Sequence, residues 1–350
     1  MSEVMGSVGS IRKISHPNTR TGSRQNPKGK KPRKLSPSND LLTRPIRDYD
    51  SYGKSDMTEL VERMMNSGGF EAVNLANGIE ILKAMNSDGN CVKFISFVGS
   101  IISTGTRGII RELIKEHAFD CIVTTCGALD HDIARTSASY YAGDFRLNDS
   151  SLLKEGIHRL GNVLIPFANY GAVIEKKVRA CLDELYYDHN KKFIAPSEIM
   201  DFIGSKLNDS SFLYWANKNH IPVIVPGIVD GAVGSQLWMF HQEHRDFGLD
   251  LLKDQTTISD IVYDDKRSGA FMIGGGISKH HTLWWNQFKG GLDYAVYLTT
   301  SPEWDGSLSG ALVEEAVSWG KITAKASRVT IHGEATTLLP FIYAALHEKG

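Results

Sequence analysis

The chain has few cysteines and no long hydrophobic run. The four cysteines, Cys91, Cys121, Cys126 and Cys181, form no C-x-x-C pair and have no histidine partners at metal-ligand spacing. We therefore expect a reduced, cytoplasmic protein without a metal site. No segment approaches the run of about 20 apolar residues that crosses a membrane, and the N-terminus lacks the apolar stretch of a signal peptide. We expect neither a membrane span nor export.

The chain also carries almost no net charge. The formal value is −1 over 350 residues, so the overall charge does not favour a nucleic-acid partner. Residues 1–40, however, hold nine Lys or Arg against two acidic residues and few large apolar side chains. We predict a disordered basic tail for 1–40 and one large folded domain for 41–350. RNA contact, or insertion into a neighbouring subunit's pocket, is the alternative to a plain solvated extension.

Short apolar runs alternate with helical patterns along the rest of the chain. The runs are 92–98, 120–125, 222–229, 270–273, 294–300 and 328–331. Helical spacing marks the stretch after residue 56, as well as 107–117 and 236–244. Apolar strands between helices predict an α/β fold with a doubly wound, mostly parallel sheet and helices on both faces. The connection 167–213 would form a subdomain or cover the sheet's edge.

Small and polar residues follow these runs, where ligands of open α/β sheets bind. The first four runs lead into GSIISTG at 99–105, TTCG at 124–127, PG at 226–227 with DG at 230–231, and GGG at 274–276. None of these is G-x-G-x-x-G, and one glycine after a strand is usually a turn. Together, four such ends favour a rim where backbone approaches a dinucleotide closely. Asp305 and Glu334 are candidates for binding ribose hydroxyls.

The segment 301–321, SPEWDGSLSGALVEEAVSWGK, is the richest in reactive groups. It places four acidic residues beside Trp304 and Trp319 and ends at Lys321. Carboxylates with aromatic faces suit a small polyamine cation; the alternative is an ordinary acidic loop and helix. Lys321 would be a nucleophile only if a wall such as Trp319 desolvated it, and otherwise a solvated helix cap.

Two further clusters contain histidine. His280 and His281 follow the triple glycine, so His280 is either a general base near neutral pH or an ordinary loop residue. Asp130, His131 and Asp132 either serve catalysis or cap a nearby helix.

Several longer motifs resemble deoxyhypusine synthase. SWGKI at 318–322, IGGGISKHH at 273–281 and DYAVYLTTSPEWDGSLSGA at 293–311 are similar to that family. EGIHRLGNVLIPFANY at 155–170, YWANKNHIPVIVPGIVDGAVG at 214–234 and VTTCGALDHDIAR at 123–135 also match in order and spacing. The resemblance begins near residue 43. It implies that 41–350 is a Rossmann-like NAD-binding catalytic domain, in a homotetramer with NAD and spermidine bound at subunit interfaces.

The resemblance also implies a reaction. NAD takes a hydride from spermidine, and the resulting imine passes to an enzyme lysine with release of diaminopropane. The aminobutyl group then moves to a lysine of the hypusine-bearing translation initiation factor, where the stored hydride reduces the final imine. The protein would thus be a cytoplasmic NAD-dependent aminobutyltransferase, with no membrane partner and no specific nucleic-acid partner.

The matched positions assign roles to individual residues. Lys321 corresponds to the imine-forming lysine and His280 to a base. The expected substrate contacts are Trp319, Glu315, Asp305, Ser235, Trp284, Leu308, Asp130 and His131. The expected NAD contacts are Ser100, Ser103, Thr125, Cys126, Gly127, Asp230, Gly274, Gly275, Gly276, Thr300, Ser301, Asp305 and Glu334.

Four of these positions depart from the eukaryotic pattern. Ser235 and Leu308 stand where aspartates occur, Trp284 replaces an asparagine, and His131 replaces a glutamate. The changes resemble archaeal-type members. Because acidic contacts to a terminal ammonium are lost, a homospermidine synthase-like enzyme with putrescine as acceptor stays open as an alternative. A second alternative, from another class, is a non-catalytic regulatory paralogue. The second predicts a lost nucleophile, whereas Lys321 is present.

Overall fold

The computed structural model describes residues 45–49 and 56–348, so the predicted tail at 1–40 lies outside the described residues. The chain divides into two units, Met1–Pro45 and Ile46–Gly350. Every helix and strand described below belongs to the second unit. No helix in the described ranges is long and apolar enough to cross a membrane.

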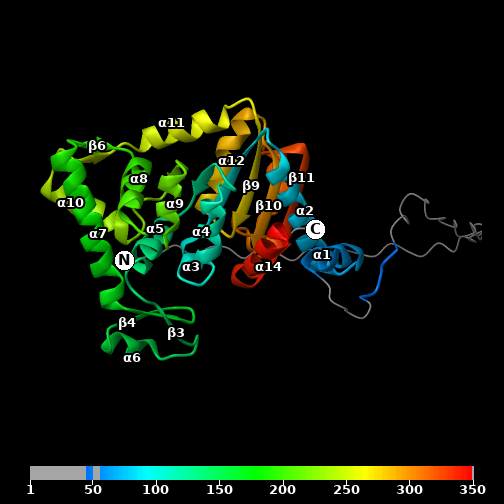
Figure 1. Ribbon diagram of the computed structural model, residues 1–350, viewed down its shortest axis with the longest axis horizontal. Coiled ribbons are helices and arrows are strands. Elements are labelled where there is room, and N and C mark those ends of the chain that lie inside the picture. The colour runs from blue at the N-terminus through cyan, green and yellow to red at the C-terminus, as the bar shows by residue number, and fades with distance from the viewer. Residues whose placement is uncertain (1–44, 50–55, 349–350) are drawn as a thin grey trace, which may run out of the picture. The chain divides into compact units, whose positions relative to one another are not determined.

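A six-stranded parallel sheet forms the centre of the second unit (Figure 1). Its strands are β1 (Cys91–Phe97), β2 (Cys121–Val123), β7 (Val223–Ile224), β9 (Arg267–Ile273), β10 (Leu292–Thr299) and β11 (Ile322–His332). The order is β11-β10-β9-β1-β2-β7, and all neighbours are parallel. The predicted α/β fold is confirmed. Each of the six predicted runs overlaps one strand, but β2 and β7 are shorter than predicted, and β9, β10 and β11 begin earlier.

Helices cover both faces of this sheet because its strands are apolar on both sides. Alternate residues of β1 enter different cores: Ile95 and Phe97 pack in one, Val92 and Phe94 in the other. The first core is covered by helices that include α2 (Phe70–Ser87), α4 (Arg107–Lys115), α5 (Cys126–Arg135) and α14 (Ala335–His347). The second is covered by α11 (Leu251–Val262), α12 (Ile277–Asn286) and α13 (Glu315–Ser318).

The remaining elements lie before, between and beyond these layers. They are α1 (Met57–Asn66), α3 (Gly99–Ile102), η2 (Phe167–Asn169), α7 (Gly171–Asp183), η3 (Glu184–Asp188), β6 (Phe193–Ile194), α8 (Pro196–Lys206), α9 (Phe212–Lys218), α10 (Ala232–Glu243), β8 (Gly248–Leu249), η4 (Gln287–Lys289) and η5 (Glu303–Asp305). Within the 167–213 connection, α8 packs against the edge strand β7. The connection therefore covers the sheet's edge, one of the two predicted arrangements.

A small antiparallel sheet was not predicted. It contains β3 (Tyr141–Ala142), β4 (Ile157–Leu160) and β5 (Val163–Pro166), with α6 (Asp149–Lys154) beside β4. Gly161 has a φ of 61° in the tight turn between β4 and β5, a conformation that favours glycine. Figure 1 shows this sheet projecting from the layered core. Its strands are short and half exposed, so they lack the continuous apolar runs that revealed the central strands.

Two aspartates of α5 hold the starts of other helices. The fully buried Asp132 accepts hydrogen bonds from the Ser211 hydroxyl (2.5 Å) and the Leu213 amide (3.1 Å) at the start of α9. It also pairs with Arg107 at 2.7 Å. Asp130 accepts from the amides of Ala232 and Val233 at 2.9 and 2.8 Å, at the start of α10. Helix N-termini leave amide donors without partners, which these carboxylates satisfy.

Replacing Asp132 with Ala should destabilise the protein by about 3–5 kcal/mol, because Arg107 would remain buried without its counter-ion. Urea unfolding measures this loss. The control is Asp149→Ala, which removes the exposed partner of Arg159 and should leave stability almost unchanged because exposed pairs contribute little. Equal small losses in both variants would contradict the capping role of Asp132.

Candidate functional site

A pocket of about 320 Å³ surrounds Lys321. Its lining is formed by Lys279, His280, Leu283, Trp284, Leu308, Ala311, Leu312, Glu315, Ala316, Trp319 and Lys321. These residues come from α12, from the segment after η5, from α13 and from the turn before β11. Six of the sequence-predicted residues meet here: Lys321, His280, Trp319, Glu315, Trp284 and Leu308.

Lys321 is held where the chain turns from α13 into β11. Gly320 has a φ of 66°, which permits the turn, and the Lys321 amide donates to the Ala316 carbonyl at 3.0 Å. The residue is only 9% exposed, so it is not a solvated cap. Its Nζ lies 5.2 Å from the ring centre of Trp319 and 5.6 Å from that of Trp284. Both rings can stabilise a positive charge on this nitrogen.

His280 lines the same pocket as this lysine. The ring is half-buried and stacks on Trp284, with centroids 5.7 Å apart. Burial and the nearby charge of Lys321 lower the pKa of His280 below its ordinary value. The imidazole is therefore neutral at pH 7 and can accept a proton. Glu315 is the one carboxylate among the lining residues of this pocket in the described part of the chain.

The predicted cofactor residues lie mainly at the carboxyl ends of the six parallel strands. Ser100 follows β1, 125–127 follow β2, Asp230 lies beyond β7, 274–276 follow β9, Thr300 and Ser301 follow β10, and Glu334 follows β11. The direction of the strand order reverses between the neighbouring strands β1 and β9, since β1 leads to β2 on one side and β9 leads to β10 on the other. Such switch points are where open α/β sheets bind ligands.

Glycine makes this rim unusually tight. A Cβ on Gly99 would come within 2.7 Å of backbone atoms of Gly127 and Ala128. Gly274 and Gly275 have φ values of 63° and 109°. The Gly99 amide also donates to the Thr125 hydroxyl at 3.1 Å. The helices α3, α5 and α12 all begin at this rim without a side-chain cap, so their amide ends are available to an anion there.

Lys321 does not lie on this rim. It precedes β11, and its carbonyl accepts from the amide of Leu292, the first residue of β10. The lysine therefore sits near the amino ends of these strands, whereas most of the predicted cofactor residues lie at the carboxyl ends. The pocket connects the two regions, because it is lined by Lys321 and also by Lys279 and His280, which lie near the start of α12 next to the glycine loop.

Several predicted residues do not line the lysine pocket. Ser235 is exposed and bonds the Gly231 carbonyl (3.1 Å), while Asp305 accepts from the Ser307 amide (2.7 Å). His131 contacts the Tyr140 hydroxyl at 3.0 Å, and burial lowers its pKa to about 4. Asp130 is the helix cap described above. Within a single chain, these four residues contribute nothing to the Lys321 pocket.

Three predicted cofactor residues have other partners. Glu334 caps α14 and accepts from the amides of Thr336 and Thr337, each at 2.9 Å. Burial, with the charge of Asp130, raises the pKa of the Cys126 thiol to about 12, so it is a neutral buried group. Ser103 lines a separate cavity of about 490 Å³ near the same rim.

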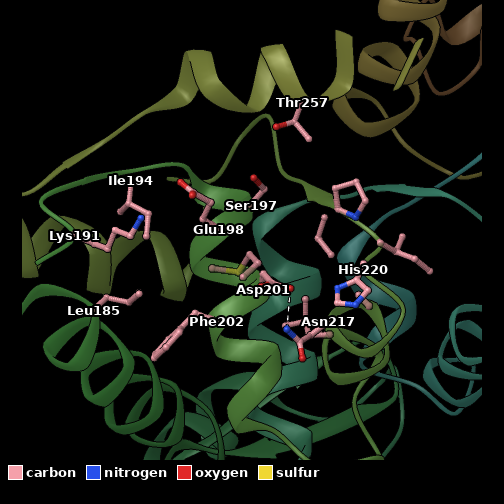
Figure 2. Close-up of a pocket in the computed structure, with 16 residues that line it drawn as sticks. Leu185, Lys191, Ile194, Ser197, Glu198, Asp201, Phe202, Asn217, His220 and Thr257 are labelled. Atoms are coloured by element: carbon pink, nitrogen blue, oxygen red, sulfur yellow. Dashed lines mark hydrogen bonds between the residues drawn. The ribbon is translucent and has the colours of Figure 1, made fainter. Parts of the chain in front are cut away.

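Another cavity, of about 480 Å³, lies at the sheet edge near β7 (Figure 2). No predicted site residue lines it, and its carboxylates are engaged. Glu198 pairs with Lys253 at 2.8 Å, and Asp201 accepts from Asn217 at 2.8 Å, as Figure 2 shows. In the described ranges no group of three or more His, Cys, Asp or Glu side chains could hold a metal. The Lys321 pocket and the glycine rim remain the best candidates.

Sequence reasoning missed Lys279. Although it precedes His280 in the SKHH motif, a lysine on a helix is usually exposed, and nothing in the sequence indicates burial. In the structure Lys279 is 1% exposed and lines the Lys321 pocket.

Comparison with known proteins identifies the family. The model of the family "DS: Deoxyhypusine synthase" matches residues 59–346. A Picrophilus torridus protein described as a probable deoxyhypusine synthase is 52% identical over 307 residues, which cover 87% of this chain and 98% of that protein. The chain belongs to the deoxyhypusine synthase family. A Thermoplasma acidophilum protein described in the same way is 50% identical over 306 residues, with the same coverage.

These matches confirm the predicted deoxyhypusine synthase, and both relatives are archaeal, as the pocket residues suggested. A crystal structure assigned to a deoxyhypusine synthase from Entamoeba histolytica covers 86% of this chain and 96% of its own, with a TM-score of 0.58 and 20% identity. That likeness supports the α/β fold of this deoxyhypusine synthase family member.

The charge of Lys321 should be visible in the titration of His280. Lys321→Ala removes a nearby positive charge and opens the pocket to water, so the pKa of His280 should rise. NMR titration of the histidine ring protons measures this change. His347, which pairs with Glu116 on a distant surface, should titrate identically in both proteins. A fall or no change for His280 would show that the two side chains do not interact.

Proposed function

We propose that the chain is an NAD-dependent deoxyhypusine synthase that carries the 4-aminobutyl group of spermidine on Lys321. The observation that supports this most directly is the burial of Lys321 between two tryptophans, next to the neutral His280. The acceptor is a specific lysine of the hypusine-bearing translation initiation factor.

The glycine rim is suited to a dinucleotide. The backbone of Gly99, Gly274 and Gly275 occupies space or conformations that a side chain would block, so phosphates can approach main-chain amides. Ser100, Thr125 and Thr300 follow the strands at this rim, so their hydroxyls are candidate donors to the cofactor. NAD, when bound, would accept a hydride from the amine and would return that hydride at the end of the reaction.

Lys321 and His280 provide the covalent step. Oxidised spermidine carries a C=N bond, whose carbon the neutral Lys321 amine attacks. The new lysine–carbon bond replaces the bond to diaminopropane, which leaves as an amine. His280 can take the proton that the Lys321 ammonium must lose before attack. The faces of Trp284 and Trp319 stabilise the cationic imine on the lysine.

The lining of the pocket supports spermidine as the amine donor. Glu315 offers a carboxylate to a terminal ammonium, while Trp284, Leu308 and Trp319 provide apolar walls for a methylene chain. With one carboxylate among the described lining residues, a small diamine such as putrescine remains a second candidate acceptor, as in homospermidine synthesis. A regulatory paralogue is not favoured, because the nucleophile is present and buried.

The assembly and location follow the same proposal. We infer a homotetramer in the cytoplasm whose sites lie between subunits, as the resemblance to the family implies. Ser235 and Asp305 are exposed and do not reach Lys321 within one chain, which supports a contribution to a neighbouring subunit's site. Asp130 and His131 are buried and do not support it. The family match begins at residue 59, which supports an N-terminal extension at 1–40 ahead of a catalytic domain at 41–350. No membrane partner and no specific nucleic-acid partner are proposed.

Borohydride trapping tests the covalent lysine. Incubation of the protein with NAD and spermidine labelled in its aminobutyl group, followed by reduction, should attach label to Lys321, as peptide mass spectrometry will show. Lys321→Ala should lose the label and reduce aminobutyl transfer by at least about 10³-fold, the scale expected for a nucleophile. Lys325→Ala changes an exposed lysine of the same strand and should retain both.

The acceptor is decided in the same assay. Label transferred to the initiation factor supports the proposed function. Label that appears only in homospermidine when putrescine is present would overturn it in favour of the second candidate. Full transfer by Lys321→Ala would exclude the covalent lysine.

The glycine rim gives a test of NAD binding. Gly99→Ala forces the β1 and β2 loops apart, so the NAD dissociation constant should rise by roughly tenfold or more, about 1.4 kcal/mol. Gly108→Ala adds the same methyl group within α4, where a Cβ meets no atom within 4 Å, and should bind NAD normally. Calorimetric titration compares the two variants. Equal NAD affinity would place the cofactor away from the glycine rim.

A further inference from the structure

One wall of the Lys321 pocket is a short segment, residues 307–312, here called the strap. Leu308, Ala311 and Leu312 of the strap line the pocket. Ser309 fixes its rim side: the Ser309 hydroxyl donates to the Gly275 carbonyl at 2.9 Å, and the Ser309 carbonyl accepts from the Thr299 hydroxyl at 2.8 Å. The strap therefore joins the glycine rim to the pocket wall.

Lys279 fixes the pocket side of the strap. Its Nζ donates to the carbonyls of Leu308 (2.9 Å) and Ala311 (2.5 Å) and lies 3.5 Å from the ring centre of Tyr297. The Tyr297 hydroxyl donates in turn to the Ser309 carbonyl at 2.6 Å. Two carbonyls and an aromatic face are the partners that a buried ammonium requires.

Burial of the Lys279 ammonium costs free energy, which other interactions must offset. Desolvation lowers the pKa of Lys279 to about 7, opposed by the charge of Glu315. An apolar side chain of similar length would fill the same space without that cost. It would, however, leave both strap carbonyls without their donor. The lysine thus provides a specific connection between α12 and the strap.

We propose that Lys279 is a positioning residue that ties the strap to α12, beside His280, and so fixes the Leu308 wall against which the amine substrate binds. The inference rests on the proposed function, since the amine is its substrate. Lys279 acts through the strap and takes no part in the covalent step, which belongs to Lys321. Loss of the tie should weaken amine binding more than turnover.

The test compares Lys279→Met with Lys289→Met in the full-length protein. Lys289 also donates to a backbone carbonyl, that of Lys266 at 2.6 Å, but it lies outside the pocket lining. In Lys279→Met we expect the KM for spermidine to rise about tenfold or more, with kcat reduced less than about threefold, because ground-state binding is lost. Lys289→Met should match the wild type.

A second measurement does not depend on turnover. Spermidine binding, followed by the fluorescence of Trp284 and Trp319 at the pocket, should weaken in Lys279→Met by a similar factor. Ser309→Ala, which cuts the strap from the Gly275 carbonyl, should weaken it in the same direction. If Lys279→Met does not fold, Ser309→Ala tests the same inference.

The outcomes separate this inference from the proposed function. Normal KM and normal spermidine binding in folded Lys279→Met, or in Ser309→Ala, would overturn the positioning role while leaving Lys321 chemistry intact. Loss of kcat at unchanged KM would also overturn it, since Lys279 would then be catalytic. A wild-type protein that binds spermidine through the strap but traps no label would instead defeat the proposed function.

Discussion

The parallel register of the central sheet determines where both parts of the site lie. β9, β10 and β11 pair side by side, so the loops after them reach one rim together with those after β1 and β2. The same register places Lys321, just before β11, near the opposite end of the strands. A reaction that uses both must extend along α12, whose first turns carry Lys279 and His280 and whose later residues include Trp284.

Much of the fold could be predicted because the central strands are continuous apolar runs. Each of the six runs overlaps a strand of the sheet, and the strand-end glycines lie at the predicted rim. The antiparallel sheet at 141–166 was missed because its strands are short and half exposed. The start of β11 was missed because 322–327 alternates small and polar residues at a largely exposed edge of the sheet.

The candidate site was predicted in part. Residues whose neighbours depend on tertiary packing could not be predicted. Lys321, His280, Trp319 and Trp284 are close in space as the resemblance implied, since local segments bring them together. Asp130 and Asp132, by contrast, cap helices α10 and α9, which lie about 80 to 100 residues further along the chain. Such partners depend on tertiary packing. Lys279 is the clearest example of a residue whose role the sequence does not reveal, because only its burial distinguishes it from an ordinary surface lysine.

We propose that the cofactor rim and the lysine pocket form one continuous site joined by the strap. A crystal structure with NAD and an unreactive spermidine analogue tests it most directly. We expect the cofactor against glycines 274–276 and the analogue between Trp284 and Trp319, with its reacting carbon next to the Lys321 nitrogen. An analogue bound in the cavity near β7, or a cofactor away from the glycine rim, would contradict it.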